Sequence, residues 1–135
     1  MTYLLDTSIW YRGVVAIDSL PPECRGILRD PEQRFGLSPI SLWEIAKKVQ
    51  IGKLRLDRPV SDWLEFALGS QIELLPMDAK VVAQAMELLD FPNRDPADEL
   101  IVATAKVHEL TLITSDRALR NYRHIQIRYF KPLSD

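Results

Sequence analysis

The sequence predicts a single α/β domain of three layers, in which helices cover both faces of a mostly parallel sheet. Short runs of β-branched and leucine residues alternate along the chain with longer segments of helical periodicity. Right-handed crossovers between parallel strands leave few other topologies for such an alternation. The length of 135 residues suits one domain and is enough to close a sizeable core without disulfides or a structural metal.

The composition is that of an ordinary globular protein, with 47% apolar and 27% charged residues. No apolar run is long enough to span a bilayer, and the first residues lack the basic start and long apolar centre of a secretory signal. We therefore expect a cytoplasmic protein without a membrane partner. Cys24 is the single cysteine, so no internal disulfide can form, and His108 and His124 lack the spacing of a zinc site.

The first elements follow from local patterns at the start of the chain. Residues 3 to 5 form a short apolar strand, and residues 6 to 8 supply a turn with the chemistry of a helix N-cap. A helix is expected over about residues 9 to 16. A second helix begins at Pro22, since proline suits the first helical turn, and runs to about residue 29.

The next segment predicts a second strand over residues 34 to 37. Ser41 can then cap a helix through about residue 51, because apolar residues recur there at spacings of three and four, and Gly52 fits the position that ends it. Residues 60 to 68 form another amphipathic helix.

A third strand is expected over residues 72 to 75. Asp78 caps a long helix whose apolar side extends to Leu89. The helix from about residue 96 to 108 is almost wholly apolar after Glu99, which is typical of a helix packed centrally in the domain.

The last part of the chain completes the alternation. Residues 111 to 114 have the clearest β composition, and residues 116 to 121 read as a short helix. Residues 125 to 129 form a last strand or its remnant.

Four acidic residues stand where an apolar strand or helix pattern meets a turn: Asp6, Glu44, Asp98 and Asp116. Open α/β sheets bind ligands at the carboxyl ends of their strands, so these side chains can share one site. Carboxylates gathered there repel one another unless they take up protons or share a cation. Mg²⁺ and Mn²⁺ prefer oxygen ligands, and an acid cluster that holds such ions can orient a phosphodiester and activate the attacking water.

Each acid also has a structural interpretation as part of a helix cap. Asp6 and Asp116 each follow a strand and precede a helix. Glu44, three residues after Ser41, completes the letters of a capping box. Residues 95 to 98 combine an Asp N-cap, a proline at the first helical position and an acid in the first turn. Four independent caps are a less economical explanation than one shared site.

The basic residues fall into two groups although the net charge is −2. Ordinary solvated helix faces look like this, but basic groups beside an acidic site would suit phosphate contacts. The first group lies between residues 47 and 58 and the second between residues 117 and 131: Lys47, Lys48, Lys53, Arg55 and Arg58, and then Arg117, Arg120, Arg123, Arg128 and Lys131.

Four segments carry these residues in a characteristic order: YLLDTSIW, SLWEIAKKVQIGKL, RDPADELIVATA and LITSD. With them the chain resembles the PIN domains, specifically the VapC-type toxin ribonucleases of prokaryotic toxin–antitoxin pairs. The resemblance covers nearly the whole chain, so residues 1 to 135 are identified as a single PIN-like domain. It implies a parallel sheet with an acidic pocket at the carboxyl ends of its strands.

The resemblance also implies roles for the four acids, which match the catalytic, Mg²⁺- or Mn²⁺-binding positions of the family. Asp6, Glu44 and Asp98 would hold the principal metal and position the hydrolytic water. Asp116 would complete the coordination shell or a second metal site. The following residues would support the ligating carboxylates or the helix start: Asp95, Thr7, Thr114 and Ser115.

Two positions depart from the family pattern, with Glu99 where many relatives carry Arg and Ser8 where a histidine is frequent. Both concern substrate contacts more than metal binding. The candidates for phosphate contacts are basic residues of the two groups: Lys47, Lys48, Lys53, Arg117 and Arg120. Four aromatic residues could stack on bases but at helical spacing are more often core or interface residues: Trp10, Tyr11, Trp43 and Trp63.

The function that the resemblance implies is metal-dependent endonucleolytic cleavage of RNA, often structured RNA such as tRNA. It further implies a cognate antitoxin that blocks the acids and a toxin homodimer. Three alternatives remain open: a PIN-type module that binds RNA or antitoxin without cleaving, an aspartate-based phosphotransfer domain, and a scaffold whose acids are all caps. The phosphotransfer reading is weakened because position 8, where a second acid would stand, is Ser8.

Overall fold

The computed structural model describes residues 1–93 and 95–134. Within them, five parallel strands form one sheet in the order β3-β2-β1-β4-β5, which confirms the predicted α/β class. The strands are β1 (Tyr3–Leu5), β2 (Phe35–Leu37), β3 (Ile72–Leu74), β4 (Thr111–Thr114) and β5 (Ile127–Tyr129). Because β1 lies between β2 and β4, the segments that follow these strands meet at one edge of the sheet.

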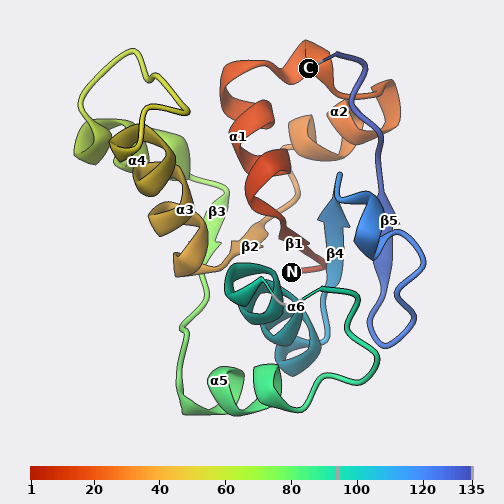
Figure 1. Ribbon diagram of the computed structural model, residues 1–135. Helices are drawn as coiled ribbons and strands as arrows, with labels where there is room; N and C mark the ends of the chain where they lie inside the picture. Colours follow the sequence, from red (N-terminus) through yellow and green to blue (C-terminus); the bar gives the residue numbers. More distant parts are fainter. Residues whose placement is uncertain (94, 135) are drawn as a thin grey trace.

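Helices connect successive strands and cover the two faces of the sheet (Figure 1). The α-helices are α1 (Thr7–Val15), α2 (Pro22–Arg29), α3 (Pro39–Gln50), α4 (Val60–Leu68), α5 (Ala79–Met86) and α6 (Pro96–His108). Two short 3₁₀ helices, η1 (Ile17–Ser19) and η2 (Arg117–Leu119), lie in the connections. No described helix combines the length and apolarity that a membrane crossing would need.

The three inner strands β1, β2 and β4 are largely buried on both faces, because successive side chains point to opposite sides of a sheet. Leu5 and Ile113 pack with apolar residues of α1, α2 and α4 in one core. Leu4 and Leu112 point the other way and pack on α6 through residues such as Val102. The apolar character of the strands and of α6 therefore reflects double-sided burial, as the sequence predicted.

Helix α5 packs on α6 and not on the sheet. Val81 and Ala85 are buried against Ala103 of α6. Figure 1 shows α6 between α5 and the sheet. The second face of the sheet is thus covered by α6, with α5 as an outer element.

Several element boundaries differ from the sequence expectation. The helix after Asp78 ends at Met86, with Glu87 as its C-cap, and does not reach Leu89. The segment expected as a short helix over residues 116 to 121 is only the 3₁₀ turn η2. Helix α3 begins at Pro39 with Ser38 as its N-cap, so the expectation that Ser41 caps this helix was wrong.

Candidate functional site

Asp6 stands directly after β1 and is almost fully buried, with 7% of its surface exposed. One carboxylate oxygen, Oδ1, accepts a hydrogen bond from the backbone N–H of Thr7 at 2.8 Å, which makes Asp6 the N-cap of α1. The other oxygen, Oδ2, accepts from the Thr114 hydroxyl at 2.5 Å. Because β1 and β4 are neighbours in the sheet, residues 108 positions apart meet at this edge.

Glu44 lies on α3 and accepts a hydrogen bond from the Thr7 hydroxyl at 2.5 Å. The same hydroxyl oxygen lies 2.7 Å from the Ser41 hydroxyl oxygen. Since the single proton of Thr7 goes to Glu44, Ser41 must donate to Thr7. Ser41 and Glu44 thus meet through Thr7 and do not form a capping box. Residues far apart in sequence share this contact, so the sequence did not reveal the role of Ser41.

Asp98 occupies the first turn of α6. Its Oδ2 accepts a hydrogen bond from the Asn93 side chain at 3.2 Å, a partner that the sequence analysis missed. Asp95 caps α6 through Oδ1, which accepts from the backbone N–H groups of Ala97 at 2.9 Å and Asp98 at 3.4 Å. Asp95 therefore holds the start of the helix that carries Asp98, which agrees with its expected capping role.

Asp116 follows β4 and caps η2, with its Oδ1 accepting from the N–H of Ala118 at 2.9 Å. Its own backbone N–H donates to the Thr114 hydroxyl at 3.0 Å. Thr114 therefore bridges two of the acidic positions. The hydroxyl oxygen of Ser115 lies 2.5 Å from that of Ser8, which joins the end of β4 to α1 and not to a carboxylate.

The four acids act on one another through space. Burial is the largest cause that raises the pKa of Asp98, to about 7 from an ordinary value of 3.8. The charges that raise it further belong to Asp6, Asp95, Asp116 and Glu44. The acids that follow β1 and β4 and the acid on α3 thus lie close enough to Asp98 on α6 for their charges to act on it.

Burial also raises the pKa values of Asp6 and Glu44. For Asp6 it is opposed by the hydrogen bonds from Thr114 and Thr7. For Glu44 it is opposed by the hydrogen bond from Thr7 and then augmented by the charge of Asp6. Lys48 lowers both pKa values, so its ammonium group lies near both carboxylates.

Within residues 1–93 and 95–134, no three Asp, Glu, His or Cys side chains are arranged so that they could hold one metal ion as they stand. The carboxylates instead accept hydrogen bonds from nearby hydroxyl, amide and backbone groups. The chemistry of the donor set nevertheless suits Mg²⁺ or Mn²⁺, because it consists of carboxylate oxygens whose mutual repulsion a cation would relieve.

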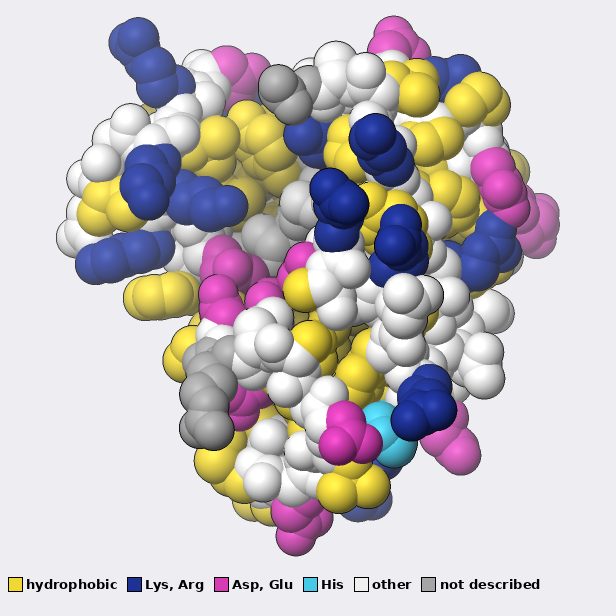
Figure 2. All heavy atoms as spheres, turned by 45° about the vertical axis from the view of Figure 1, so that its right-hand side comes forward, with side chains coloured by type: hydrophobic (Ala, Val, Ile, Leu, Met, Phe, Trp, Pro, Cys, Tyr) yellow, Lys and Arg dark blue, Asp and Glu magenta, His cyan; other side chains and the backbone are white. Residues whose placement is uncertain are grey.

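A cavity of about 490 Å³ opens beside the acids. None of the four acids lines it, but Thr7, which contacts Asp6 and Glu44, does. Lys48, Lys53 and Arg12 line it together with apolar residues of α1 and α3. Arg12 was not among the sequence candidates. Figure 2 shows acidic side chains gathered in a hollow with basic side chains on both sides of it.

The remaining basic candidates, Lys47, Arg117 and Arg120, are not among the residues that line this cavity. Lys47 is exposed and donates to the Gln50 side chain at 2.7 Å, although it directly precedes Lys48. Arg117 and Arg120 are exposed in and beside η2, the turn that Asp116 caps. The guanidinium of Arg120 lies 5.8 Å from the centre of the Tyr129 ring. Among these candidates, the charge of Lys48 acts on the pKa values of both Asp6 and Glu44.

The aromatic candidates divide into core and surface residues. Trp10 and Trp63 are buried with ring centres 5.5 Å apart, and Tyr11 packs on Trp63 at 5.9 Å. These residues belong to the core, as aromatic residues at helical spacing usually do. Trp43 is the exception, with 57% of its surface exposed on α3.

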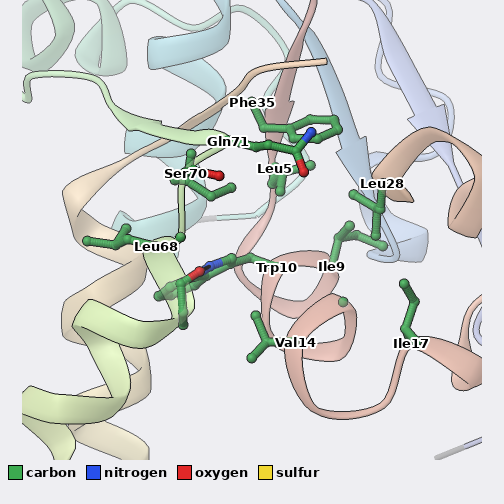
Figure 3. A pocket seen from close by; sticks show the side chains of 14 residues that line it. Leu5, Ile9, Trp10, Val14, Ile17, Leu28, Phe35, Leu68, Ser70 and Gln71 are labelled. Carbon is green, nitrogen blue, oxygen red and sulfur yellow. Dashed lines mark hydrogen bonds between the residues drawn. The ribbon is translucent and has the colours of Figure 1, made fainter. Parts of the chain in front are cut away.

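A second cavity of about 190 Å³ lies beside the other side of α1 (Figure 3). Its walls are mostly apolar and include Ile9, Trp10, Leu28 and Phe35. The Gln71 amide nitrogen is held by the backbone carbonyls of Asp30 and Gln33, at 2.9 and 2.8 Å. Neither the four acids nor Thr7, which contacts Asp6 and Glu44, lines this cavity, so it is separate from the acidic site.

The PIN domain family model matches residues 3–125 of the chain. The chain belongs to the PIN domain family. The match spans every strand except β5, which follows it, and includes all four acidic positions.

Within the PIN family, the sequence is 32% identical over 124 residues to Ribonuclease VapC22 of Mycobacterium tuberculosis. That alignment covers 91% of this chain and 93% of the relative, so this PIN domain is of the VapC type. The recognised resemblance is thereby confirmed.

Solved structures share the PIN fold at lower identity. VapBC2 from Rickettsia felis, bound to a DNA fragment from its promoter, aligns with a TM-score of 0.70 at 21% identity, over 96% of this chain and 99% of that one. FitAcB from Neisseria gonorrhoeae aligns with a TM-score of 0.63 at 22% identity, over 93% of this chain and 96% of that one. At these identities the alignments establish the fold alone.

Proposed function

We propose that the protein is a metal-dependent endoribonuclease that hydrolyses phosphodiester bonds of structured RNA such as tRNA, and that it is the toxin of a toxin–antitoxin pair. The observation that carries the proposal is the meeting of Asp6, Glu44, Asp98 and Asp116 at one edge of the sheet in a VapC-type PIN domain. Caps alone do not account for this meeting, because Glu44 and Asp98 cap no helix in the structure.

Asp6, Glu44 and Asp98 would hold Mg²⁺ or Mn²⁺, and Asp116 would complete the shell or a second site. A bound divalent ion supplies an activated water at neutral pH and stabilises the charge that develops on the phosphate oxygens. Burial and mutual repulsion already disfavour the ionised carboxylates, so a cation at this place offsets an existing electrostatic cost.

The chain's own polar groups orient these carboxylates. Thr114 and the backbone of Thr7 hold both oxygens of Asp6, and the Thr7 hydroxyl holds Glu44. Asn93 holds one oxygen of Asp98. Hydrogen bonds of this kind fix the rotation of ligating groups and tune their basicity.

RNA would be positioned by the basic residues around the acids. Lys48, Lys53 and Arg12 line the cavity. Arg117 and Arg120 are exposed in and beside η2, the turn that Asp116 caps. Contacts from such residues go to phosphates and position a strand without reading its sequence. The cavity thus holds basic side chains beside Thr7, the residue that contacts Asp6 and Glu44.

A cognate antitoxin and a second copy of the chain are further proposed partners. The similar structures include one described as a toxin–antitoxin complex from Klebsiella pneumoniae and a DNA-bound VapBC from Salmonella typhimurium. The wide cavity beside the acids could admit an antitoxin segment that blocks access to them.

The test is cleavage of mixed tRNA by the purified protein with Mg²⁺ or Mn²⁺, beside Asp6→Asn and Asp98→Asn. Asp62→Asn, in the exposed first turn of α4, is the matched control. We expect cleavage by the wild type and the control and loss of cleavage in both site variants. Equal activity in all four proteins would refute the site, and RNA binding without cleavage by the wild type would support the non-cleaving alternative.

A further inference from the structure

The connection between α5 and α6 carries Asn93, the residue that holds Asp98. The Asn93 amide nitrogen donates to Oδ2 of Asp98 at 3.2 Å. The amide oxygen of Asn93 accepts a hydrogen bond from the backbone N–H of Asp95 at 2.9 Å. Both ends of this side chain are therefore engaged, one with an acid of the candidate site and one with the residue that caps α6. The direction of the Asp98 carboxylate thus depends on where the main chain places Asn93.

The chain that leads to Asn93 is held by Tyr122, which lies in the connection between η2 and β5. Between α5 and Asn93 the chain forms no helix or strand, so its shape depends on contacts with other segments. Figure 1 shows the two connections side by side at the lower right. The Tyr122 hydroxyl donates to the Leu89 carbonyl at 2.8 Å, and its ring meets the Phe91 ring edge to face with centres 5.6 Å apart. Tyr122 is a firm anchor because it is buried in the core on the α6 side of the sheet.

His124 and Asp90 add a second contact between the same two connections. The ring nitrogen Nε2 of His124 lies 3.3 Å from Oδ2 of Asp90, and the His124 ring packs against the Tyr122 ring with centres 5.4 Å apart. Asp90 has a positive φ of 52°, which is uncommon for residues other than glycine. Such a conformation persists where the surrounding contacts hold it. Residues 89 to 91 are therefore held one after another by Tyr122 or His124.

The connection that contains Tyr122 begins at another acid of the site. Asp116 caps η2, and the N–H of Tyr122 donates to the carbonyl of Leu119, the last residue of η2, at 3.0 Å. The charge of Asp116 acts on Asp98, so the two carboxylates repel one another when both are ionised. A link between their two segments opposes that repulsion. Tyr122 lies in this link.

We propose that Tyr122, supported by His124, is a positioning residue that holds the chain at Leu89 and Phe91 so that Asn93 fixes the direction of the Asp98 carboxylate. The hydrogen bonds of Tyr122 within the described residues go to Leu89 and Leu119 and to none of the four acids, so Tyr122 acts through Asn93. The consequence for Mn²⁺ rests on the proposed function. The positioning itself exists without a metal.

The first experiment measures the positioning in the metal-free protein. Nuclear magnetic resonance relaxation of the Asn93 side-chain amide reports how firmly this group is held. We expect its order parameter to fall in Tyr122→Phe, which removes the hydroxyl donor and keeps the ring. Tyr3→Phe is the matched control and should leave the order parameter unchanged, because Tyr3 starts β1 at the end away from Asp6. An unchanged order parameter in folded Tyr122→Phe would overturn the proposal.

The second experiment is a double-mutant cycle on Mn²⁺ affinity, measured by calorimetric titration. We expect Asn93→Ala to lower the affinity by about 10- to 100-fold and Tyr122→Phe to lower it by about three- to tenfold. Because Tyr122 acts through Asn93, the double variant should bind no more weakly than Asn93→Ala alone. Losses that add fully in the double variant would overturn the proposal. Thermal unfolding checks that each variant is folded at the temperature of the titration.

Failure of the proposed function and failure of this inference give different results. A wild type that neither binds Mn²⁺ nor cleaves RNA would refute the proposed activity, and the relaxation of the Asn93 amide would still decide the positioning. A wild type that cleaves RNA but binds Mn²⁺ no more tightly than Tyr122→Phe would refute this inference alone. His124→Ala should also lower the order parameter of the Asn93 amide, and an unchanged value would remove His124 from the proposal.

Discussion

Two threonine hydroxyls hold the carboxylates at this edge of the sheet. Thr7 donates to Glu44 across 37 positions of sequence, and Thr114 donates to Asp6 across 108. Both threonines are buried, so their hydroxyl groups cannot turn to solvent without losing these bonds. The orientation of the acids therefore depends on residues that carry no charge themselves.

Replacement of Thr114 by valine tests this dependence. Thr114→Val keeps the shape but removes the donor to Asp6, so we expect Mn²⁺ affinity to fall by about 10- to 100-fold. Thr104→Val is the matched control, because Thr104 is equally buried but donates to the Leu100 carbonyl within α6. Calorimetric titration with Mn²⁺ measures both variants. An equal loss of affinity in both would argue against a specific role for Thr114.

The raised pKa of Asp98 predicts how pH affects the stability of the metal-free protein. Between pH 4 and about pH 7 the folded state keeps a proton on Asp98 that the unfolded chain has released. Stability from this group is therefore lost as pH rises through that window. Asp98→Asn removes the titration and should stabilise the metal-free protein at pH 8 by about 1 kcal/mol, a value kept small because the carboxyl is only partly buried and is screened by solvent.

Urea denaturation at pH 4 and at pH 8 without divalent ions measures the effect. The variant and the wild type should differ at pH 8 and approach one another at pH 4, where Asp98 is protonated in the folded state. A destabilised variant at pH 8 would contradict the raised pKa. Added Mn²⁺ should reverse the order at pH 8, since the wild type alone retains the full set of acids.

At the scale of the elements, two buried serines of one segment have different roles. Ser38 accepts a hydrogen bond from the N–H of Ile40 and caps α3, whereas Ser41 contacts Thr7. From the sequence either serine could precede the helix. Pro39 resolves the choice, because proline suits the first helical position and leaves Ser38 as the cap.

Replacement of Ser38 and replacement of Ser41 should therefore have different effects. Ser38→Ala should lower the free energy of unfolding by about 1 kcal/mol and leave Mn²⁺ affinity unchanged. Ser41→Ala should lower Mn²⁺ affinity, because Thr7 loses the hydroxyl that donates to it while it holds Glu44. Thermal unfolding and Mn²⁺ titration on both variants measure the difference. Identical profiles would refute the division of roles.

At the scale of the whole molecule, charges of both signs meet at one hollow although the net charge is only −2. The acids cluster there, and basic residues of α1 and α3 line the adjoining cavity. Nothing in the sequence favours Lys48 over its neighbour Lys47. In the structure Lys48 lies near Asp6 and Glu44, whereas Lys47 contacts Gln50. Only the direction in which each side chain leaves α3 distinguishes them.

Lys48 is therefore expected to contribute to RNA binding more than Lys47. Lys48→Ala should weaken RNA binding across sequences and lower the slope of log K against log salt by about 1. Lys106→Ala, near the C-terminal end of α6, is the matched control and should leave the slope unchanged. Fluorescence anisotropy at several salt concentrations, with an inactive Asp6→Asn background, measures the slopes. An unchanged slope in Lys48→Ala would remove Lys48 from the phosphate contacts.

The sequence by itself determined the α/β class, the order of the elements and the family, because strand and helix periodicity and the four motif segments are local features of the chain. It also identified the four acids as candidates. Asp6, Asp98 and Asp116 do stand at or next to the start of a helix, whereas Glu44 lies inside α3 and not at a boundary.

Only the tertiary structure decided which neighbours hold and tune those acids. Ser41, Asn93 and Lys48 act through contacts that no local pattern encodes. The end of α5 at Met86 and the packing of this helix on α6 were also decided there. The physical reason is common to both cases: hydrogen bonds, burial and charge act over ångströms in space, whereas the periodicity of a sequence reports only on the element to which a residue belongs.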